Sequence, residues 1–482
     1  MSLRLAALLL LPVLTAPSTQ HARPAEPEPE RLASVLIEGV PHVRQRPDFC
    51  GEACAEMWLQ KLGKDATQDD VFALTGLDPS LGRGAWTDEL SKALKKMGFD
   101  VGQTWYRVQD EAGVAEQFRA LHADLLRGVP SITCGHYSDE PQTTEHFRLV
   151  LGYDAVKDEV VYHEPAEDRG GYRRMKRELF LKLWTFKPRP DRWTLIRMRL
   201  DPKSGVSAAR DRSKPSAADF VQRVMELKER TRGKPFTIVV ERPFVIVGDE
   251  APKTVREHGG STVRWTVSLL RKDFFARDPE EIIDVWAFKD AGSYQRHAWE
   301  YFGDRPNTPY GYYSDRHHAL IMNIGLGYGT LVHEIVHPYM HVNFPEVPPW
   351  LNEGLASLYE RPAEDDGHII GYVNWRLPAL QRDIRAKSVP SFKTVFEMDE
   401  NKFYNDDDDH YAQSRYLCLY LQEKGLLREF VADFLKNKKE DPTGYATLRK
   451  VLGNPDMGAF QKKWERYVAE LNPKAARAPK PE

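Results

Sequence analysis

Cysteine is scarce in this sequence. Only four occur in 482 residues, namely Cys50, Cys54, Cys134 and Cys418. A small secreted scaffold held by disulfides carries cysteine far more densely, so that class of protein is excluded. Each thiol therefore needs its own explanation, and for Cys418, inside an apolar helical run, packing in a core is the simplest.

An excess of charge of one sign is also missing. The 68 Lys and Arg residues nearly balance the 71 Asp and Glu residues, the net charge is -3, and no basic stretch stands out. The composition thus gives no electrostatic reason to expect a nucleic-acid partner. The acidic run at residues 406–409 is most simply a solvated loop or helix start; a calcium site is the sharper alternative, but EF-hand spacing is absent.

Long hydrophobic runs are nearly absent, apart from one at the N-terminus. Residues 5–14 are apolar, Arg4 precedes them and small residues follow. The run is too short to span a bilayer, and this arrangement is typical of a secretory signal. We therefore predict a signal peptide over residues 1–22, cleaved after Ala16 or Ala22, and a secreted or periplasmic protein with no stable membrane insertion. The alternative is an N-terminal helix of the mature fold.

Apolar residues are plentiful elsewhere: 41% of the chain is hydrophobic and 11% aromatic. A chain of this length exceeds one hydrophobic core, which favours two or more domains. Residues 33–200 pattern as helices followed by antiparallel strands, and residues 201–217, rich in Ser, Ala and charge, predict a linker. Residues 218–475 pattern as a small sheet and then mostly helices. The predicted fold class is α+β.

The clearest chemical pattern is "HEIVH", residues 333–337. Four residues along a helix bring His333 and His337 to one face, with Glu334 beside them. A catalytic zinc needs three protein ligands and leaves a fourth position for a water molecule. The sequence therefore predicts His333 and His337 as ligands of Zn2+ and Glu334 as the general base.

The third ligand must come from outside this motif. Glu353 in "WLNEGLA", at the start of an amphipathic helix, is the best candidate, and Glu346 and Glu360 are weaker alternatives. His341 lies two helical turns from His333, roughly 12 Å along an unbroken helix, which is too far to share the ion. We predict the ligand set His333, His337 and Glu353.

Pro338 follows the second histidine directly. It lacks an N–H, so the helical bond to the Glu334 carbonyl is lost, and its ring crowds that carbonyl. We predict that the helix kinks or ends near His337. Both histidine ligands lie at or before this point, so their spacing survives, and His341 should fall outside the ligand set.

The pair "HEIVH" and "WLNEGLA" resembles the gluzincin metallopeptidases, over about residues 235–470. The resemblance implies zinc-dependent hydrolysis of peptide bonds. It also implies a strand before the first ligand helix that lines up extended substrate, here "HHALIMNIG", and a later tyrosine or histidine that stabilises the oxyanion. Tyr411 is the first candidate, with His410 and Tyr416 as competitors; for each of them, packing along a helix is an equally simple explanation.

A second chemistry is indicated by "VRQRPDFCGEACAEMWL". Cys50 opens a predicted helix, where the N-terminal amides favour a thiolate. His146, at the start of a strand, is a candidate base, Glu164 in the next strand could orient its ring, and Gln45 could donate to the oxyanion. Taken alone, Cys50 is also consistent with a small buried hydrophobe.

The order Gln, Cys, His, acid, with helices before the sheet, resembles papain-like cysteine peptidases of the bacteriocin-leader-processing type. The resemblance covers about residues 35–200. Two positions depart from it: Glu164 stands where relatives usually have Asp or Asn, and Gln45 precedes Cys50 by five positions rather than six. Cys54, one turn after Cys50, is expected to pack inward; trapping the nucleophile and pairing with Cys134 stay open.

These patterns together predict an exported two-domain peptidase that acts on a peptide or protein substrate. It would combine zinc-dependent hydrolysis in the C-terminal domain with cysteine-dependent hydrolysis in the N-terminal domain. Two alternatives remain. The papain-like part could be a non-catalytic peptide-binding or targeting module, or both sites could be inactive and the chain a scaffold.

Overall fold

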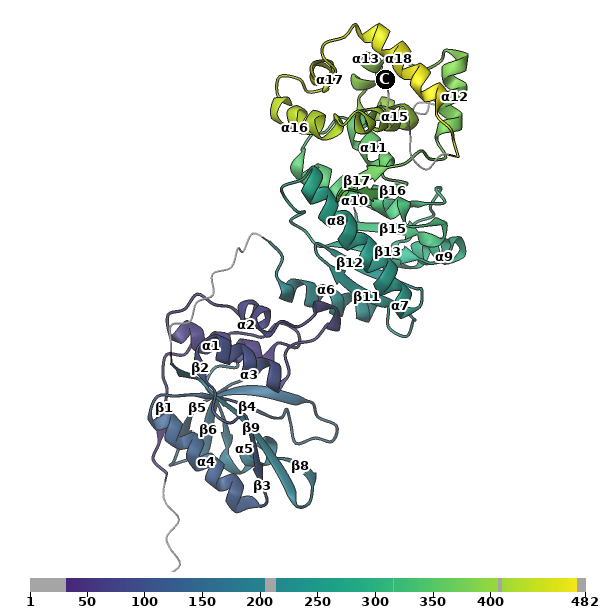
Figure 1. The fold of residues 1–482 in the computed structure, drawn as a ribbon. Coiled ribbons are helices and arrows are strands. Elements are labelled where there is room, and N and C mark those ends of the chain that lie inside the picture. The colour runs from purple at the N-terminus through teal and green to yellow at the C-terminus, as the bar shows by residue number, and fades with distance from the viewer. Residues whose placement is uncertain (1–31, 204–213, 315, 406–409, 475–482) are drawn as a thin grey trace, which may run out of the picture.

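The computed structural model describes residues 32–203, 214–314, 316–405 and 410–474. The predicted signal peptide, the acidic run at 406–409 and most of the predicted linker lie outside these ranges. Two sheet-containing parts follow one another along the molecule, and helix α6 lies at their junction (Figure 1). None of the helices that the structure describes combines the length and apolar character needed to cross a membrane.

The N-terminal part consists of helices packed against an eight-stranded sheet with the order β3-β9-β4-β5-β6-β7, in which β1 pairs with β5 and β8 with β9. Its strands are β1 (Val35–Leu36), β3 (Trp105–Val108), β4 (Ser131–His136), β5 (Glu145–Asp154), β6 (Glu159–His163), β7 (Arg173–Lys176), β8 (Phe186–Arg189) and β9 (Arg192–Arg199). Its helices are α1 (Cys50–Lys61), α2 (Gln68–Thr75), η1 (Pro79–Leu81), α3 (Thr87–Lys96), α4 (Glu111–Leu126) and α5 (Arg177–Trp184).

Helix α1 lies against strand β5, and a glycine makes their close approach feasible. A Cβ on Gly51 would lie 2.4 Å from Leu90 Cδ2 and 3.1 Å from Phe147 Cδ2. A larger residue directly after Cys50 would require the Leu90 side chain to move, so glycine suits this position. The first turn of α1 is thereby placed beside the start of β5.

The sheet-bearing N-terminal part continues beyond residue 200. Strand β10 (Asp201–Pro202) pairs antiparallel with β2 (Phe99–Asp100). The first two residues of the predicted linker thus form a strand. Helix α6 begins at Ala217, the last residue of that linker.

The C-terminal part contains a five-stranded sheet with the order β11-β12-β13-β15-β14. The three central strands run parallel, and both edge strands are antiparallel to their neighbours. The strands are β11 (Thr237–Glu241), β12 (Phe244–Gly248), β13 (Ile283–Phe288), β14 (Gly311–Ser314) and β15 (Ala319–Asn323). "HHALIMNIG" therefore contains an internal strand, β15, whose backbone is paired on both sides. The edge belongs to β14, so the expectation that the HHALIMNIG strand itself lines up substrate is wrong.

Both faces of this sheet are covered, because alternate strand residues contribute to two separate cores. One core joins the sheet to α8 and α10, and the other joins it to α6 and α9. The helices here are α6 (Ala217–Arg230), α7 (Pro252–Thr254), η2 (Val255–Gly260), α8 (Ser261–Asp273), α9 (Ala291–Phe302), η3 (Ile324–Leu326) and α10 (Gly329–Asn343).

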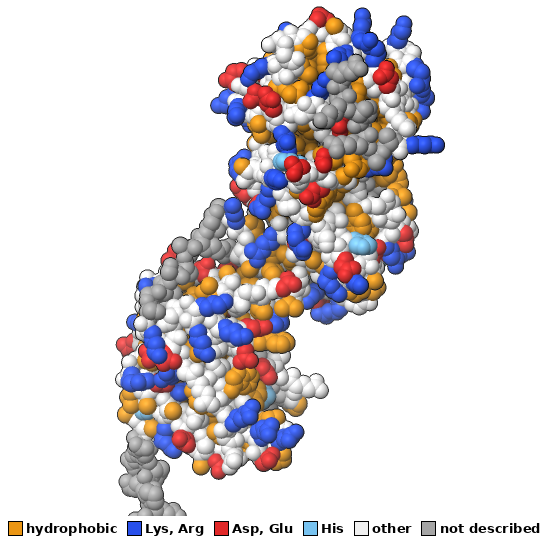
Figure 2. Space-filling view, viewed as in Figure 1, with side chains coloured by type: hydrophobic (Ala, Val, Ile, Leu, Met, Phe, Trp, Pro, Cys, Tyr) orange, Lys and Arg blue, Asp and Glu red, His pale blue; other side chains and the backbone are white. Residues whose placement is uncertain are grey.

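The rest of the chain is mostly helical, and a two-stranded hairpin interrupts it. Helix α11 packs against α15 and α10. The elements are α11 (Pro349–Leu358), β16 (Pro362–Asp365), β17 (His368–Gly371), α12 (Leu377–Ala386), α13 (Phe392–Phe396), α14 (Glu400–Asn405), α15 (His410–Glu423), α16 (Leu427–Asn437), α17 (Tyr445–Val451) and α18 (Met457–Glu470). The predicted α+β class is confirmed. On the face shown in Figure 2, acidic and basic side chains are interspersed over both parts.

Candidate active sites

Three of the predicted ligands form a compact group between α10 and α11. His333 Nε2 lies 3.5 Å from Glu353 Oε2, and His337 Nε2 lies 4.0 Å from Glu353 Oε1. One ligand atom from each residue lies within 4.8 Å of the others. Ligands about 2.1 Å from a tetrahedral zinc lie about 3.4 Å apart. The group is thus close to the separation that one ion requires.

Packing explains why these helices present the three side chains to one another. The opposite face of α10 is buried in the core through side chains such as Leu331, Ile335 and Val336. Helix α11 lies so close to α15 that a Cβ on Gly354 would be 3.0 Å from the Ser414 carbonyl oxygen. The glycine of "NEG" therefore allows this contact, which sets the position of Glu353.

The Glu353 carboxylate is buried and only partly satisfied. Its Oε1 accepts a 2.9 Å hydrogen bond from Tyr404 Oη, whereas Oε2 is buried without a hydrogen-bond partner among the described atoms. Burial alone would raise the pKa of Glu353, but the nearby imidazoles of His333 and His337 outweigh burial and lower it. A buried carboxylate that faces two imidazoles and keeps one oxygen unpaired is an arrangement that suits a cation.

The pKa of His333, in contrast, is raised. Burial alone would lower it, but the close carboxylate of Glu353 and the charges of Glu334 and Glu360 raise it to about 9. In the absence of an ion, the group therefore holds a proton on an imidazole among carboxylates.

The remaining nitrogen of each imidazole faces an oxygen. His337 Nδ1 lies 3.0 Å from Asn352 Oδ1, and His333 Nδ1 lies 3.7 Å from Glu360 Oε1. Such outer contacts fix the ring orientation of metal-binding histidines. Glu360, a weaker candidate for the third ligand, thus approaches His333 from the side opposite Glu353 and lies outside the group of three.

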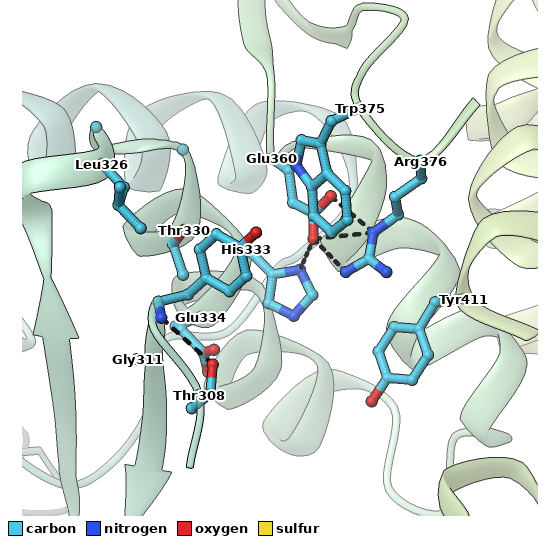
Figure 3. Close-up of a pocket in the computed structure, with 13 residues that line it drawn as sticks. Thr308, Gly311, Leu326, Thr330, His333, Glu334, Glu360, Trp375, Arg376 and Tyr411 are labelled. Atoms are coloured by element: carbon cyan, nitrogen blue, oxygen red, sulfur yellow. Dashed lines mark hydrogen bonds and ion pairs between the residues drawn. The ribbon is translucent and has the colours of Figure 1, made fainter. Parts of the chain in front are cut away.

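Glu360 is itself held firmly, which sequence reasoning missed. Arg376 binds it through Nη2 at 2.8 Å from Oε1 and Nε at 3.0 Å from Oε2, and Asn374 Nδ2 donates to Oε2 at 2.7 Å. Figure 3 shows Glu360 between His333 and Arg376. The sequence offered no spacing signal for this contact, because Arg376 follows a hairpin whose path depends on tertiary packing.

The predicted base and oxyanion donor both line a cavity next to this group. Its volume is about 430 Å³, and Glu334, His333 and Tyr411 contribute to its wall (Figure 3). Burial raises the pKa of Tyr411, as do the charges of Glu353 and Tyr404, so its hydroxyl keeps its proton at neutral pH. The competitors do not line this cavity: Tyr416 is fully buried with Oη near Asn374, and His410 is 1% exposed.

The helix does not end near His337, contrary to one of the two outcomes predicted for Pro338. Helix α10 continues through Pro338 to Asn343. A proline inside a helix costs about 3 kcal/mol, and burying a large apolar side chain recovers roughly 1.5–3 kcal/mol. Tyr339 and Met340, both 0% exposed, therefore hold the helix past the proline.

Glu346, the other alternative for the third ligand, and His341, which the sequence excluded, both lie outside the group of three. His341 is exposed on α10, and Glu346 is exposed in the loop that follows, with a φ of 61°. The prediction that excluded His341 agrees with this geometry.

At the second candidate site, α1 begins at Cys50, as the sequence predicted. Burial raises the pKa of the Cys50 thiol to about 12; the charges of Glu52 and Asp48 raise it further, and backbone hydrogen bonds with Phe147 and Gly51 lower it. The sequence predicted that the amides at the start of α1 favour a thiolate. Desolvation of the buried thiol raises its pKa more than these amides lower it. The thiol needs a base.

The candidate base, His146, lies next to a residue that the thiol contacts, and its ring is held by Glu164. The Cys50 thiol contacts the backbone of Phe147, the residue after His146. His146 Nε2 forms a short hydrogen bond with Glu164 Oε1, and Arg148 Nε donates to Glu164 Oε2 at 2.9 Å. Burial alone would raise the pKa of Glu164, but the contacts with His146 and Arg148 lower it. The carboxylate is thus charged and fully engaged.

Arg148 was missed from the sequence, although a signal existed. Alternate residues of a strand share a face, so position 148 of β5 must lie beside position 146. Glu164 directly follows β6 rather than lying within it. The pairing of β5 with β6 then brings Glu164 to both side chains.

Gln45 contacts the residue that follows Glu164. Its backbone N–H donates to the Pro165 carbonyl at 2.9 Å, and its side-chain Oε1 is buried with no hydrogen-bond partner among the described residues. All four cysteines are free, so Cys54 and Cys134, both buried, do not form a disulfide in this structure. The structure thus brings the Gln45 loop to the Glu164 loop.

Comparisons with known proteins bear on the N-terminal part. The model of the Peptidase_C39 like family matches residues 37–187. The crystal structure of the peptidase domain of Streptococcus ComA, a bi-functional ABC transporter involved in quorum sensing, is similar at 14% identity and a TM-score of 0.23, covering 34% of this chain and 99% of that one. No curated protein matches the chain. The predicted resemblance to papain-like cysteine peptidases is thus confirmed for this part; the gluzincin resemblance lies beyond the residues that the family matches.

Proposed function

We propose that this chain, whose residues 37–187 are similar to the C39 peptidases, is a peptidase with two separate centres. The family match points to hydrolysis of peptide bonds by a cysteine mechanism and implies a peptide substrate. We add a zinc-dependent peptidase centre in the C-terminal part, at His333, His337 and Glu353. Each centre has its own carboxylate and its own candidate base.

One observation carries the zinc proposal. Glu353 Oε2 is buried without a hydrogen-bond partner among the described atoms and lies 3.5 Å from His333 Nε2. A buried oxygen in this state costs free energy unless a cation or donor satisfies it. Two imidazole nitrogens and one carboxylate oxygen form the donor set that zinc hydrolases use, and such a set would leave one position for a water molecule.

The residues around the cavity suit hydrolysis of an amide. Bound zinc would lower the pKa of a water molecule towards neutrality. Glu334 follows ligand His333 and lines the same cavity, so its carboxylate would take the proton from the attacking water and pass it to the leaving amine. The Tyr411 hydroxyl, protonated at neutral pH, would donate a hydrogen bond to the oxyanion of the tetrahedral intermediate.

The cavity also suggests how a peptide lies in it. Gly311 of edge strand β14 lines the cavity, as does Tyr310 just before it. An edge strand can pair with an extended peptide through its free backbone groups. Three apolar side chains on the cavity wall are exposed: Tyr310 at 38%, Trp375 at 56% and Leu326 at 60%. We therefore propose preference for a peptide with a large apolar side chain near the scissile bond.

At the cysteine centre, the proton would move from the Cys50 thiol to His146 and then to the leaving amine. His146 Nε2 is engaged by Glu164, so Nδ1 is the nitrogen that would accept the Cys50 proton as the sulfur attacks the carbonyl. Burial raises the pKa of the Cys50 thiol, so the attack depends on this transfer to the imidazole. The imidazolium would then protonate the leaving amine, and Gln45 would donate to the oxyanion.

We further propose export of the chain, on the N-terminal pattern of residues 1–22 described above. The alternative, that the papain-like part is a non-catalytic binding or targeting module, has a separate test. In that case Cys50→Ala would leave every hydrolytic activity of the protein unchanged.

The deciding experiment compares the wild type with Glu334→Gln and Cys50→Ala on an unstructured protein such as casein, with and without a zinc chelator. We expect a chelator-sensitive activity that Glu334→Gln removes and a chelator-resistant activity that Cys50→Ala removes. If either variant removed both activities, or if the chelator had no effect, the assignment of two centres would be wrong.

A further inference from the structure

Helix α6 contacts both parts of the molecule. Its residues Phe220, Val224 and Leu227 pack into the core of the five-stranded sheet. Its residues Ala218 and Val221, on another face, pack against the N-terminal part. One helix is thus shared by two cores, so movement of either part is transmitted to the other.

Arg223 strengthens the attachment of α6 to the C-terminal sheet. Its Nε and Nη2 bind the two oxygens of Asp284 at 3.0 and 2.6 Å. Asp284, on β13, is 2% exposed, and paired buried charges of this kind resist separation. Helix α6 therefore belongs firmly to the C-terminal part while it reaches the N-terminal one.

The surface that α6 contacts on the N-terminal part includes the turn immediately before Cys50, beside contacts with η1 and α2. Arg46 Nη1 lies 2.9 Å from Asp219 Oδ1 of α6 and 2.8 Å from Asp69 Oδ2 of α2. Gln222 Nε2 donates to the Pro47 carbonyl at 3.2 Å. Two consecutive residues of the turn are therefore bound by α6 side chains.

The next residues of the turn are fixed as well. Phe49, the residue that caps α1, is 0% exposed, stacks on Phe72 at 5.0 Å and shares its core with Ala218 and Val221 of α6. Between these contacts, Asp48 adopts a φ of 65°, a left-handed conformation that costs a non-glycine residue free energy. A strained turn keeps its shape only when its surroundings hold it.

This turn joins two residues of the proposed cysteine centre, the oxyanion donor and the nucleophile. Gln45 precedes it and Cys50 follows it. We infer that α6 sets the geometry of the cysteine centre, and that Arg46 and Asp219 are positioning residues for the Gln45–Cys50 turn. The inference rests on the proposed cysteine-peptidase function for its activity readout, and it makes the C-terminal part a requirement for full activity of the N-terminal centre.

The inference is tested in the full-length chain with Asp219→Asn and Arg46→Gln. Small displacements of reacting groups cost up to about 100-fold in rate, so we expect the Cys50-dependent kcat to fall about tenfold, with KM nearly unchanged. Chelator-sensitive hydrolysis should stay at the wild-type level. Arg46→Lys, which keeps a charge and one donor towards Asp219, should recover most of the kcat.

A second readout does not depend on hydrolysis. Alkylation of Cys50 by iodoacetamide, located by peptide mass spectrometry, reports the environment of this thiol at each pH. A displaced turn should shift the pH profile of alkylation, which a merely structural contact would leave unchanged. Lys228→Met is the matched control, because its Nζ bonds the Leu81 carbonyl across the same interface, away from the turn.

The two readouts separate failure of the inference from failure of the function. If the wild type had no Cys50-dependent hydrolysis, the proposed function would fail, and the alkylation profile would still test positioning. Wild-type profiles and kcat in both folded variants would overturn the inference. Should Asp219→Asn not fold, Gln222→Ala replaces it, and an unchanged profile and kcat there would overturn the inference equally.

Discussion

Each of the two candidate centres contains a buried carboxylate between two nitrogen-bearing side chains, but the partners differ in charge. Glu164 is held by His146 and by Arg148, a permanent cation whose Nε is 2.9 Å away. Glu353 faces two imidazoles at 3.5 and 4.0 Å and has no permanent cation in contact among the described residues. The pKa of both carboxyls is lowered.

This difference indicates what each centre still needs. The cysteine centre is electrostatically complete, because arginine neutralises its carboxylate and leaves the imidazole to exchange protons. The group of His333, His337 and Glu353 is incomplete, since its charge balance rests on a proton that a divalent ion can replace. The first centre should therefore be independent of metal, and the second should be inert without it.

The largest expected effect is at Glu334, the general base of the proposed zinc centre. Glu334→Gln removes the proton acceptor but none of the three ligands, so we expect chelator-sensitive hydrolysis to fall by about 10²–10⁴-fold while zinc stays bound. Activity and zinc content are measured on the same preparation. Glu346→Gln, in an exposed loop, is the control that should keep full activity, and loss of zinc together with activity would contradict the role of Glu334.

A matched pair of carboxyl-to-amide changes tests the comparison through stability. Glu164→Gln leaves the buried Arg148 without its carboxylate, which should cost about 3–5 kcal/mol of unfolding free energy. Glu353→Gln removes no partner of a permanent cation, so in metal-free protein it should cost far less. Urea unfolding with a chelator present measures both. Equal losses would show that the two carboxylates are held alike.

A third buried carboxyl, that of Glu52, has neither an arginine nor an imidazole as partner among the described residues. It should make the free energy of unfolding depend on pH. Glu52, 0% exposed on α1, has its pKa raised by burial to about 8 from 4.5. The folded state therefore binds the proton more tightly than the unfolded state, so stability is highest below pH 4.5 and falls as the pH rises to about 8.

A rise in pKa from 4.5 to about 8, at about 1.4 kcal/mol for each pH unit, corresponds to a total loss of roughly 5 kcal/mol, most of which falls between pH 5 and pH 8.5. Glu52→Gln should abolish it. Urea unfolding of the wild type and the variant at pH 5 and pH 8.5 measures the difference; parallel behaviour of the two proteins would contradict a neutral Glu52.

A smaller effect, on zinc affinity, is expected at Glu360, which contacts the proposed ligand His333. Glu360→Gln weakens the oxygen that faces His333 Nδ1 and should weaken zinc binding by about 10–100-fold. Competition with a chromogenic chelator measures the affinity. Glu364→Gln, on the neighbouring hairpin strand β16, should leave the affinity unchanged.

The smallest effect concerns the substrate. Trp375→Ala removes an exposed ring that stacks on Tyr310, with centroids 5.8 Å apart. An aromatic contact contributes about 0.5–1.5 kcal/mol, so KM for peptides with a large apolar side chain should rise up to about tenfold at constant kcat. Peptides with small side chains should show little change, and a uniform rise for all peptides would exclude a selective contact.

The parts of this molecule that the sequence predicted depend on local spacing. Histidines four apart on a helix, and a cysteine at the start of a helix, lie where those rules require. The family match confirms the papain-like interpretation of residues 37–187. The position of Glu353 followed from a second helix packing back on the first, which its glycine-bearing motif already suggested.

What the sequence did not predict depends on tertiary packing. Arg376 and Tyr404 reach Glu360 and Glu353 from segments 16 and 51 residues away, with no periodicity to relate them. The helix continues past Pro338 because its next residues are buried, and burial is not visible in a local pattern. The contact of α6 with the turn before Cys50 likewise joins residues 173 positions apart.

The most direct test of the central claim is the zinc content of the purified full-length chain beside that of Glu353→Gln, measured by mass spectrometry of the metal after dialysis without chelator. The account predicts one zinc per chain in the wild type, the same in Cys50→Ala, and little or none in Glu353→Gln. A wild type without zinc, or a Glu353→Gln variant that keeps its zinc, would contradict it.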